Sequence, residues 1–307
     1  MTDTVQRSRF SLWMQAVRPF AFTASITPVL LGTALAFFEI GRLNGLFFLA
    51  ALVGGMLLHA GTNLVAEFYD LKIGADRPET FGSSRVLVEG LMVPQDVLRG
   101  GLIAFGAAFL VGIYLVWHLG WPIVVLGIIG ILGGYFYTGG FIGYKYRALG
   151  EPFVFALMGP LMVFGAYYVQ TERFSWTPIL VSIPIGILVA SILNGNNLRD
   201  IPDDYRAGFK TIPGKLGWPA SARNYRMLII SAYVILVILV ATKVAPVWGL
   251  IALLSIIPSL KLHKTVISAR PLTPSDLAML DVSTAQVHFL FGLLLTAGFI
   301  LGKFFCK

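Results

Sequence analysis

Long apolar runs recur along this chain and are separated by shorter polar segments. Nine runs can be counted, and they are centred on residues 20–38, 46–66, 100–117, 121–138, 152–170, 178–195, 226–242, 246–260 and 284–302. Because about 20 apolar residues in a helix cross the hydrocarbon core of a bilayer, this pattern predicts nine transmembrane helices. Ten-residue segments of strict polar and apolar alternation, which mark an outer-membrane barrel, are absent from the sequence. We therefore expect an all-α membrane protein, folded as a single nine-helix domain over residues 1–307.

The composition excludes a soluble globular domain of this size. Hydrophobic residues make up 57% of the 307 residues and charged residues only 12%, and the mean hydropathy is +0.80. Soluble domains carry about twice that share of charged residues. Residues 1–19 are polar and basic and lack a small-residue cleavage site, so we interpret them as an amphipathic lead-in to the first span.

The net charge of +8 is distributed by membrane side, which argues against a nucleic-acid partner. With a cytoplasmic N-terminus, 18 of the 23 Lys and Arg residues fall on the cytoplasmic side, as the positive-inside rule requires. This distribution predicts a multi-pass protein of the cytoplasmic (inner) membrane, in contact with lipid. The acidic residues favour the same side, 13 of 15, although acids contribute little to orientation. We therefore expect the functional site to face the cytoplasm.

Two polar clusters follow the second and the sixth predicted helix, four helices apart. The first contains Asn63, Glu67, Asp70 and Asp76, and the second contains Asn196, Asn197, Asp200, Asp203 and Asp204. The equivalent positions suggest two four-helix halves, about 20–138 and 152–260, followed by a ninth helix at about 284–302. Coincidence between two cytoplasmic loops remains the alternative explanation.

Local geometry predicts how each cluster is presented. Asn63, Glu67 and Asp70 are spaced by four and three residues, which places them on one face of a helix. In the second cluster, Pro202 disfavours helical geometry at Ile201, so we expect Asp200 to end the sixth helix. Asp203 and Asp204 are then expected on the loop beyond it. The two acidic groups should face each other at the cytoplasmic membrane surface.

Carboxylates that lie within a few ångströms of one another stay ionised only if cations compensate them. Mg²⁺ is the obvious cation, because it is typically held by one or two carboxylates together with phosphate oxygens. A diphosphate between two such ions would explain the nearby basic residues, which are Lys72, Arg85, Lys145, Arg147, Arg199 and Lys210.

The alternative is that these acids are solvated surface charge. It is weakened by the stretch "LLHAGTNLVAEFYD" at 57–70, which places its acids at the end of an apolar run without an interleaved Lys or Arg. The surface or lipid-headgroup interpretation is kept for Asp203, Arg206, Lys215, Arg223 and Arg226.

Aromatic side chains crowd the end of the fourth predicted helix, beside Lys145 and Arg147. Tyr137 and Tyr146 are candidates to shield a carbocation with the negative faces of their rings, although core packing or lipid contact is the simpler explanation. His59, His118, His263 and His288 lie on different segments without metal-ligand spacing, and packed or interfacial histidines are expected there.

Several stretches together resemble the UbiA superfamily of intramembrane prenyltransferases. They include "NLVAEFYDLKIGAD", "GEPFVFALMGP" and "NGNNLRDIPDDYRAGFKT", and the resemblance covers nearly the whole chain. It implies nine helices and two Asp-rich motifs, after helices 2 and 6, that bind Mg²⁺ and an isoprenyl diphosphate. The sequence is most similar to the branch that prenylates 1,4-dihydroxy-2-naphthoate in menaquinone synthesis.

The resemblance implies site residues. Asn63, Glu67, Asp70 and Asp76 would form the first site, and Asn197, Asp200 and Asp204 the second, with Glu67 and the four aspartates as metal ligands. Asn197, Lys145 and Arg147 would contact the diphosphate, as would Lys72, Arg85 and Lys210. One position departs from the family, whose first motif usually has Asn-Asp where this chain has Ala66-Glu67.

The activity that the resemblance implies is Mg²⁺-dependent transfer of a polyprenyl group to 1,4-dihydroxy-2-naphthoate. Diphosphate and CO₂ would be lost on the way to demethylmenaquinone. The same chemistry on 4-hydroxybenzoate, homogentisate or a glycerol-phosphate lipid remains open. A secondary transporter is a further alternative, but transporters place their binding groups near the bilayer midplane, whereas these acids crowd one surface.

Overall fold

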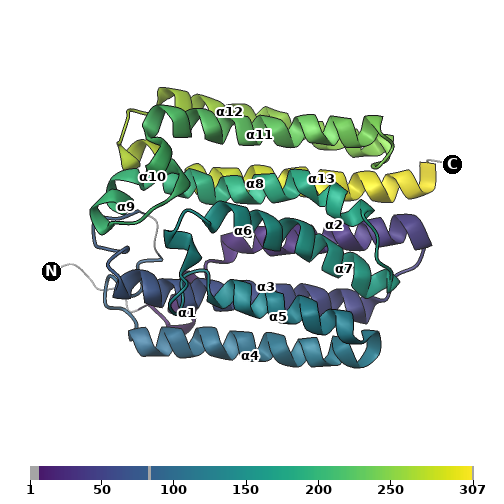
Figure 1. The fold of residues 1–307 in the computed structure, drawn as a ribbon, viewed down its shortest axis with the longest axis horizontal. Coiled ribbons are helices and arrows are strands. Elements are labelled where there is room, and N and C mark those ends of the chain that lie inside the picture. Colours follow the sequence, from purple (N-terminus) through teal and green to yellow (C-terminus); the bar gives the residue numbers. More distant parts are fainter. Residues whose placement is uncertain (1–6, 82–83, 306–307) are drawn as a thin grey trace.

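The computed structural model describes residues 7–81 and 84–305, which form a layered bundle of roughly parallel and antiparallel helices (Figure 1). Eight helical segments in this part of the chain are long and apolar enough to cross a membrane. They are Pro19–Ile40, Gly45–Lys72, Pro94–Leu119, Gly150–Thr171, Thr177–Arg199, Trp218–Ala241, Val247–Ser268 and Pro274–Phe305. Each coincides with a predicted span. The remaining prediction, 121–138, falls on the shorter apolar helix Trp121–Tyr135.

Most of these segments contain one long α-helix each, and some also contain a 3₁₀ or π turn. The helices are α2 (Thr23–Ile40), α3 (Gly45–Lys72), α4 (Pro94–Leu119), α5 (Trp121–Tyr135), α6 (Gly150–Ala156), α7 (Met162–Thr171), α8 (Thr177–Arg199), α11 (Trp218–Ala241), α12 (Ile256–Ser268) and α13 (Leu280–Phe305). Shorter elements connect or extend them, namely α1 (Arg9–Val17), η1 (Pro19–Phe22), η2 (Tyr144–Tyr146), η3 (Leu157–Leu161), α9 (Ile201–Ala207), α10 (Ile212–Leu216), η4 (Val247–Ser255) and η5 (Pro274–Leu277).

One interruption has a clear local cause. The span from α6 to α7 passes through η3, a π-helical turn that contains Pro160. Proline lacks the N–H that an α-helix interior needs, and its ring collides with the preceding turn. The wider π turn accommodates the ring, so the span continues without breaking.

The last helix, α13, packs against α2, α8 and η4, and therefore joins segments from both ends of the sequence. The main core lies around these helices and α11, where Leu31, Ile185, Ile229 and Phe291 are fully buried. In Figure 1, α11 and α12 form one outer layer and α4 the opposite one. The short helices α9 and α10 lie at the same end of the bundle as α1.

The end of α8 corrects one prediction. Asp200 caps α8 as expected, but Asp203 and Asp204 lie in the first turn of α9 and not on a loop. Pro202 stands in that first turn, where backbone N–H groups have no helical partner and proline is tolerated. The proline therefore starts a new helix directly after the old one ends.

Candidate functional site

Both acidic clusters line a single cavity of about 180 Å³ at the end of the bundle that carries α9 and α10. We call it the polar cavity. The first cluster contributes Asn63, Glu67, Asp70 and Asp76, and the second contributes Asn196, Asn197, Asp200, Asp203 and Asp204. The fold thus brings residues of α3 and of α8 and α9, which lie more than a hundred positions apart in the chain, to one cavity, as the sequence led us to expect.

Asp70 is held by two side chains of η2. Lys145 Nζ donates to Asp70 Oδ2 at 2.8 Å, and the Tyr146 hydroxyl donates to Asp70 Oδ1 at 2.5 Å. The turn that presents them is fixed by its backbone, because Lys145 N donates to Tyr137 O at 2.9 Å. Lys145 lines the polar cavity, so a cation already sits between the two acidic clusters.

The rest of the first cluster is positioned by the chain that follows α3. Both carboxylate oxygens of the buried Glu67 accept hydrogen bonds from Ser84, from its hydroxyl at 2.6 Å and from its backbone N–H at 3.3 Å. The backbone N–H of Asp76 donates to Asp70 O at 3.2 Å, which folds Asp76 back toward the cavity. Burial, together with the nearby Asp70, raises the pKa of Asp76 to about 8.

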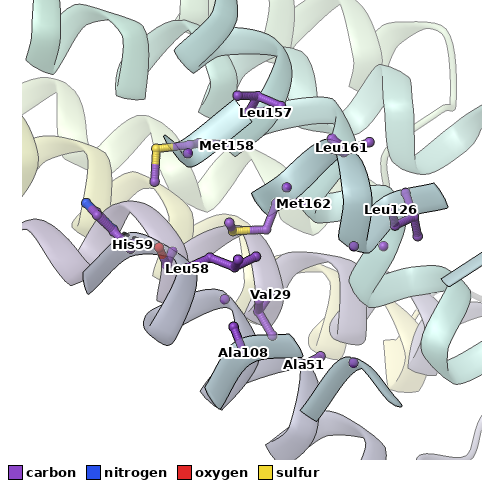
Figure 2. A pocket seen from close by; sticks show the side chains of 18 of the residues that line it. Val29, Ala51, Leu58, His59, Ala108, Leu126, Leu157, Met158, Leu161 and Met162 are labelled. Atoms are coloured by element: carbon purple, nitrogen blue, oxygen red, sulfur yellow. Dashed lines mark hydrogen bonds between the residues drawn. The ribbon is translucent and has the colours of Figure 1, made fainter. Parts of the chain in front are cut away.

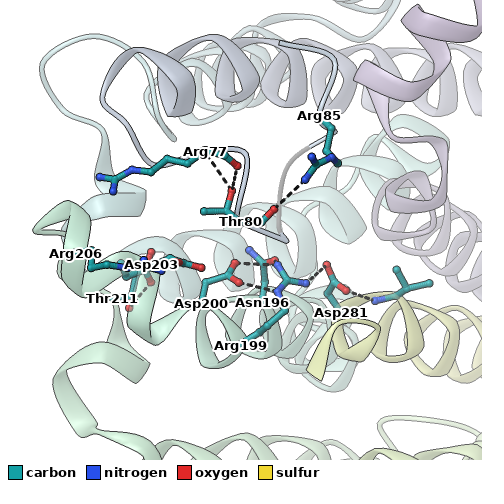
Figure 3. A network of polar contacts seen from close by, with 12 residues as sticks. Arg77, Thr80, Arg85, Asn196, Arg199, Asp200, Asp203, Arg206, Thr211 and Asp281 are labelled. Carbon is teal, nitrogen blue, oxygen red and sulfur yellow. Dashed lines mark hydrogen bonds and ion pairs between the residues drawn. The ribbon is translucent and has the colours of Figure 1, made fainter. Parts of the chain in front are cut away.

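In the second cluster, Arg199 binds two carboxylates at once (Figure 3). Its Nε and Nη2 donate to Asp200 Oδ1 and Oδ2 at 2.7 and 2.9 Å, and its Nη1 lies 3.3 Å from Asp281 Oδ2. Its guanidinium also donates to Asn196. Arg199 is only 2% exposed, so this bidentate pair fixes Asp200 firmly at the cavity wall.

The two acidic residues of α9, Asp203 and Asp204, have different partners. Asp204 accepts a hydrogen bond from Thr211 Oγ1 at 3.0 Å, and burial with the nearby Asp200 raises its pKa to about 7. Asp203 pairs with the exposed Arg206 but also lines the cavity (Figure 3). The surface interpretation therefore fits Arg206 and does not fit Asp203.

The donor set suits a hard cation. Carboxylate and amide oxygens line the cavity, and burial, together with neighbouring carboxylates, raises the pKa of Asp76 and of Asp204, so a bound cation would favour their ionised forms. No three His, Cys, Asp or Glu side chains within residues 7–81 and 84–305 form a ready metal-ligand group. Mg²⁺ usually takes one or two carboxylates and completes its shell with water and phosphate.

An apolar cavity of about 300 Å³ continues from the polar one into the bundle (Figure 2). We call it the apolar cavity. The two share lining residues, which are His59, Asn63, Tyr137, Val154 and Met158. Figure 2 shows the apolar side chains of Leu58, Leu157, Leu161 and Met162 around it. The pair can accept a ligand with a charged head and a long apolar tail.

Four predicted diphosphate contacts lie outside the lining of the polar cavity. Lys72 is exposed and lies over the Tyr69 ring, and Arg85 pairs with Glu89 at 2.7 Å. The exposed Arg147 donates from Nη2 to Phe141 O at 2.9 Å, and the exposed Lys210 is tied through its backbone to Tyr146. Their assignment gains no support from this geometry. Of the two tyrosines, Tyr137 lines both cavities, whereas Tyr146 contacts Asp70 without lining either.

Two charged lining residues were missed by sequence reasoning. Arg18 precedes η1 with a left-handed φ of 60° and lines the polar cavity. Asp281, at the start of α13, also lines it. Asp281 carries the signal used for the first cluster, an acid at the end of an apolar run, and it could have been found in that way. Arg18 carries no comparable local signal.

Comparisons with known proteins agree with this geometry. Residues 25–280 match the model of the UbiA prenyltransferase family. The 1,4-dihydroxy-2-naphthoate octaprenyltransferase of Bacillus subtilis (strain 168) is 35% identical over 293 residues, which cover 95% of this chain and 93% of that protein. UbiA prenyltransferase domain-containing protein 1 of Danio rerio is 33% identical over 298 residues, 96% of this chain and 85% of that protein.

The fold is also found in a solved structure. A UbiA homolog from Archaeoglobus fulgidus, solved bound to GPP and Mg²⁺, superposes with a TM-score of 0.64. The match covers 94% of this chain and 100% of that one, at 13% sequence identity. At that identity the likeness establishes a shared helical fold.

Proposed function

Because this chain belongs to the UbiA prenyltransferase family and is a prenyltransferase, we propose that it transfers a polyprenyl group from a polyprenyl diphosphate to 1,4-dihydroxy-2-naphthoate. The observation that carries the proposal is the junction of the polar and apolar cavities, which matches a substrate with a charged diphosphate and a long apolar tail. The positive-inside distribution supports a polar cavity that opens to the cytoplasm from the inner membrane.

Cations of this chain are available to bind the diphosphate. Lys145 lines the polar cavity and is shared with Asp70, and Arg18 lines it from the start of the first span. The Arg18 guanidinium lies over the Phe20 ring and donates no hydrogen bond to any described residue, so its N–H groups are available for phosphate oxygens, which they can bind in a bidentate manner. The tail would then extend past Tyr137 into the apolar cavity.

The residues that would hold Mg²⁺ are those whose oxygens line the polar cavity in the two clusters, with Asp70 and Asp76 on one side and Asp200 and Asp204 on the other. Bound there, Mg²⁺ would neutralise the diphosphate oxygens and so stabilise the leaving group. The Mg²⁺ bound to the solved Archaeoglobus fulgidus homolog supports Mg²⁺ as the cation.

The proposed reaction breaks the allylic C–O bond, and its electron pair leaves on the diphosphate. Lys145 and Arg18 stabilise that developing charge, while the Tyr137 ring presents its negative face to the carbocation. The ring carbon that bears the acceptor's carboxylate attacks the cation, and the bond from this carbon to the carboxylate then breaks, so that CO₂ leaves and the electron pair restores the aromatic ring. The product is the dihydroxy form of demethylmenaquinone, which gives the quinone on oxidation. The apolar cavity excludes water, which would otherwise capture the cation.

The acceptor is proposed from the Bacillus subtilis relative, whose name states a naphthoate substrate and which matches along nearly its whole length. Purified protein in vesicles, supplied with one polyprenyl diphosphate and several aromatic acceptors, tests the proposal by the mass of the product. We expect a prenylated product from 1,4-dihydroxy-2-naphthoate that lacks the mass of CO₂. A product from 4-hydroxybenzoate, homogentisate or a glycerol-phosphate lipid alone would replace the proposed acceptor.

Metal dependence through both clusters gives a second test. We expect Asp70→Asn and Asp200→Asn each to reduce turnover by roughly a hundredfold, the usual cost of losing one electrostatic contact in a transition state. Asp96→Asn is the matched control, because Asp96 is an exposed acid at the start of α4, paired with Arg99. Full activity in EDTA, or normal turnover in either cavity variant, would contradict the metal assignment.

A further inference from the structure

Glu151 lies at the start of α6, buried behind the wall of the polar cavity. It is 6% exposed and does not line the cavity. Its Oε1 accepts two hydrogen bonds from side-chain amides of α8, from Asn197 Nδ2 at 3.0 Å and from Asn194 Nδ2 at 3.2 Å. Only Asn197 of these three lines the cavity. A carboxylate outside the cavity thus holds the amide of a residue inside it.

This contact decides which end of the Asn197 amide faces the cavity. The nitrogen and oxygen of a planar side-chain amide point in different directions, the first as a donor and the second as an acceptor. The nitrogen is bound to Glu151, and the Asn197 oxygen accepts no hydrogen bond from any described residue. The oxygen is therefore the end left for a ligand, and amide oxygens are suitable ligands for hard cations.

We propose that Glu151 is a positioning residue, which locks the Asn197 amide with its oxygen toward the polar cavity as a ligand for the divalent cation. The inference rests on the proposed function, because it places a cation in that cavity. Glu151 acts by accepting hydrogen bonds, so a neutral side chain with an oxygen in the same place can replace it. Partners that orient a metal ligand typically affect metal affinity by about 10–100-fold.

Direct measurement of metal binding tests this without relying on turnover. The full chain is purified in nanodiscs and titrated with Mn²⁺, and free Mn²⁺ is measured by electron paramagnetic resonance. We expect Glu151→Leu to weaken Mn²⁺ binding by about tenfold or more. Glu151→Gln keeps an oxygen that accepts both amides and should stay within about threefold of the parent. Asn194→Ala is the matched control, because it removes the other amide on Glu151 without touching the cavity.

A double-mutant cycle separates orientation from other roles of Glu151. If Glu151 acts through Asn197, Glu151→Leu should add no further loss of Mn²⁺ affinity to Asn197→Ala. Size-exclusion profiles confirm that each variant is folded before titration. Equal losses in Glu151→Gln and Glu151→Leu, or additive losses in the cycle, would overturn the inference. So would parental Mn²⁺ affinity in Glu151→Leu. A parent chain that binds no Mn²⁺ even with diphosphate present would instead overturn the proposed metal site on which the inference rests.

Discussion

At the scale of single residues, position within the fold separates side chains that look alike in the sequence. Lys145 and Arg147 are two residues apart, and both follow the aromatic cluster. Lys145 turns into the polar cavity and binds Asp70, whereas Arg147 is exposed and binds a backbone carbonyl. A three-residue 3₁₀ turn, η2, is enough to send them in different directions.

This difference gives a prediction with a matched pair of variants. Lys145→Ala removes a charged contact to the diphosphate, which typically costs about 1.5 to 3 kcal/mol. The apparent affinity for a prenyl diphosphate should then fall by roughly tenfold or more. Arg147→Ala should change it by less than about threefold, because Arg147 does not reach the cavity. Steady-state kinetics with varied prenyl diphosphate measure both, and a large loss in Arg147→Ala alone would reverse the assignment.

Glu67 belongs to the first acidic cluster, and its contacts constrain its role. It lines the polar cavity, yet both its oxygens are engaged by Ser84. A carboxylate oxygen can accept more than one hydrogen bond or ligand, so the contact with Ser84 leaves room for a cation.

We expect Glu67→Gln to raise the Mg²⁺ concentration needed for half-maximal activity, because it removes a charge at nearly constant shape. Glu67→Asp should remain active, since it keeps the carboxylate. Ser84→Ala serves as the comparison, because it removes the hydroxyl partner and leaves the charge. Activity measured against Mg²⁺ concentration distinguishes them. An unchanged Mg²⁺ requirement in Glu67→Gln would leave Glu67 with a structural role alone.

At the scale of the elements, close helix packing positions the wall that carries Glu151 and Asn197. The span containing α6 and η3 approaches α8 at two glycines. A Cβ added to Gly159 would lie 2.7 Å from Gly186 Cα, which is closer than backbone atoms allow. Small residues at such contacts let membrane helices approach each other closely.

Gly159→Ala is therefore expected to destabilise the protein. Overpacking at a tight contact typically costs about 1–3 kcal/mol. Thermal unfolding in detergent should show a lower midpoint than the parent. Gly106→Ala is the control on α4, because an added Cβ there meets nothing within 4 Å. Equal midpoints for the two variants would show that the helices can move apart without cost.

At the scale of the whole molecule, the polar cavity at one end of the bundle joins the apolar cavity inside it. The polar cavity is built mainly from η1, α2, α3, η2, α8, α9 and α13, with Val154 of α6 and Met158 of η3, and the apolar one mainly from α2 to α7. The two halves of the chain therefore contribute unequally to the head and to the tail of the proposed substrate.

A larger side chain in the apolar cavity should reduce activity more for substrates with a long prenyl tail than for those with a short one. Gly55 lines it, and an added Cβ there makes only ordinary contacts at 3.8 Å or more, so a larger side chain would occupy the cavity itself. Gly55→Leu should lower kcat/KM for a long polyprenyl diphosphate by about tenfold or more, and affect a two-isoprene substrate less. Gly106→Leu, on the outer face of α4, should change neither. Equal losses for both substrates in Gly55→Leu would place the tail elsewhere.

The sequence by itself determined the apolar segments and the two acidic clusters, and it predicts which side of the membrane carries the charge. These are local properties, since hydropathy over about 20 residues and spacing along one helix do not depend on what packs nearby. Pro202 was misjudged because its local effect depends on whether a helix continues through it or begins there.

Tertiary structure alone decided which charged groups meet. Helix packing brings Arg18, Lys145 and Asp281, from three distant segments, to the same cavity, while it leaves Lys72 and Arg147 outside. It also places Glu151 behind Asn197. Such contacts arise between elements far apart in the chain, where periodicity along one helix predicts which face is polar but not which residue that face will contact.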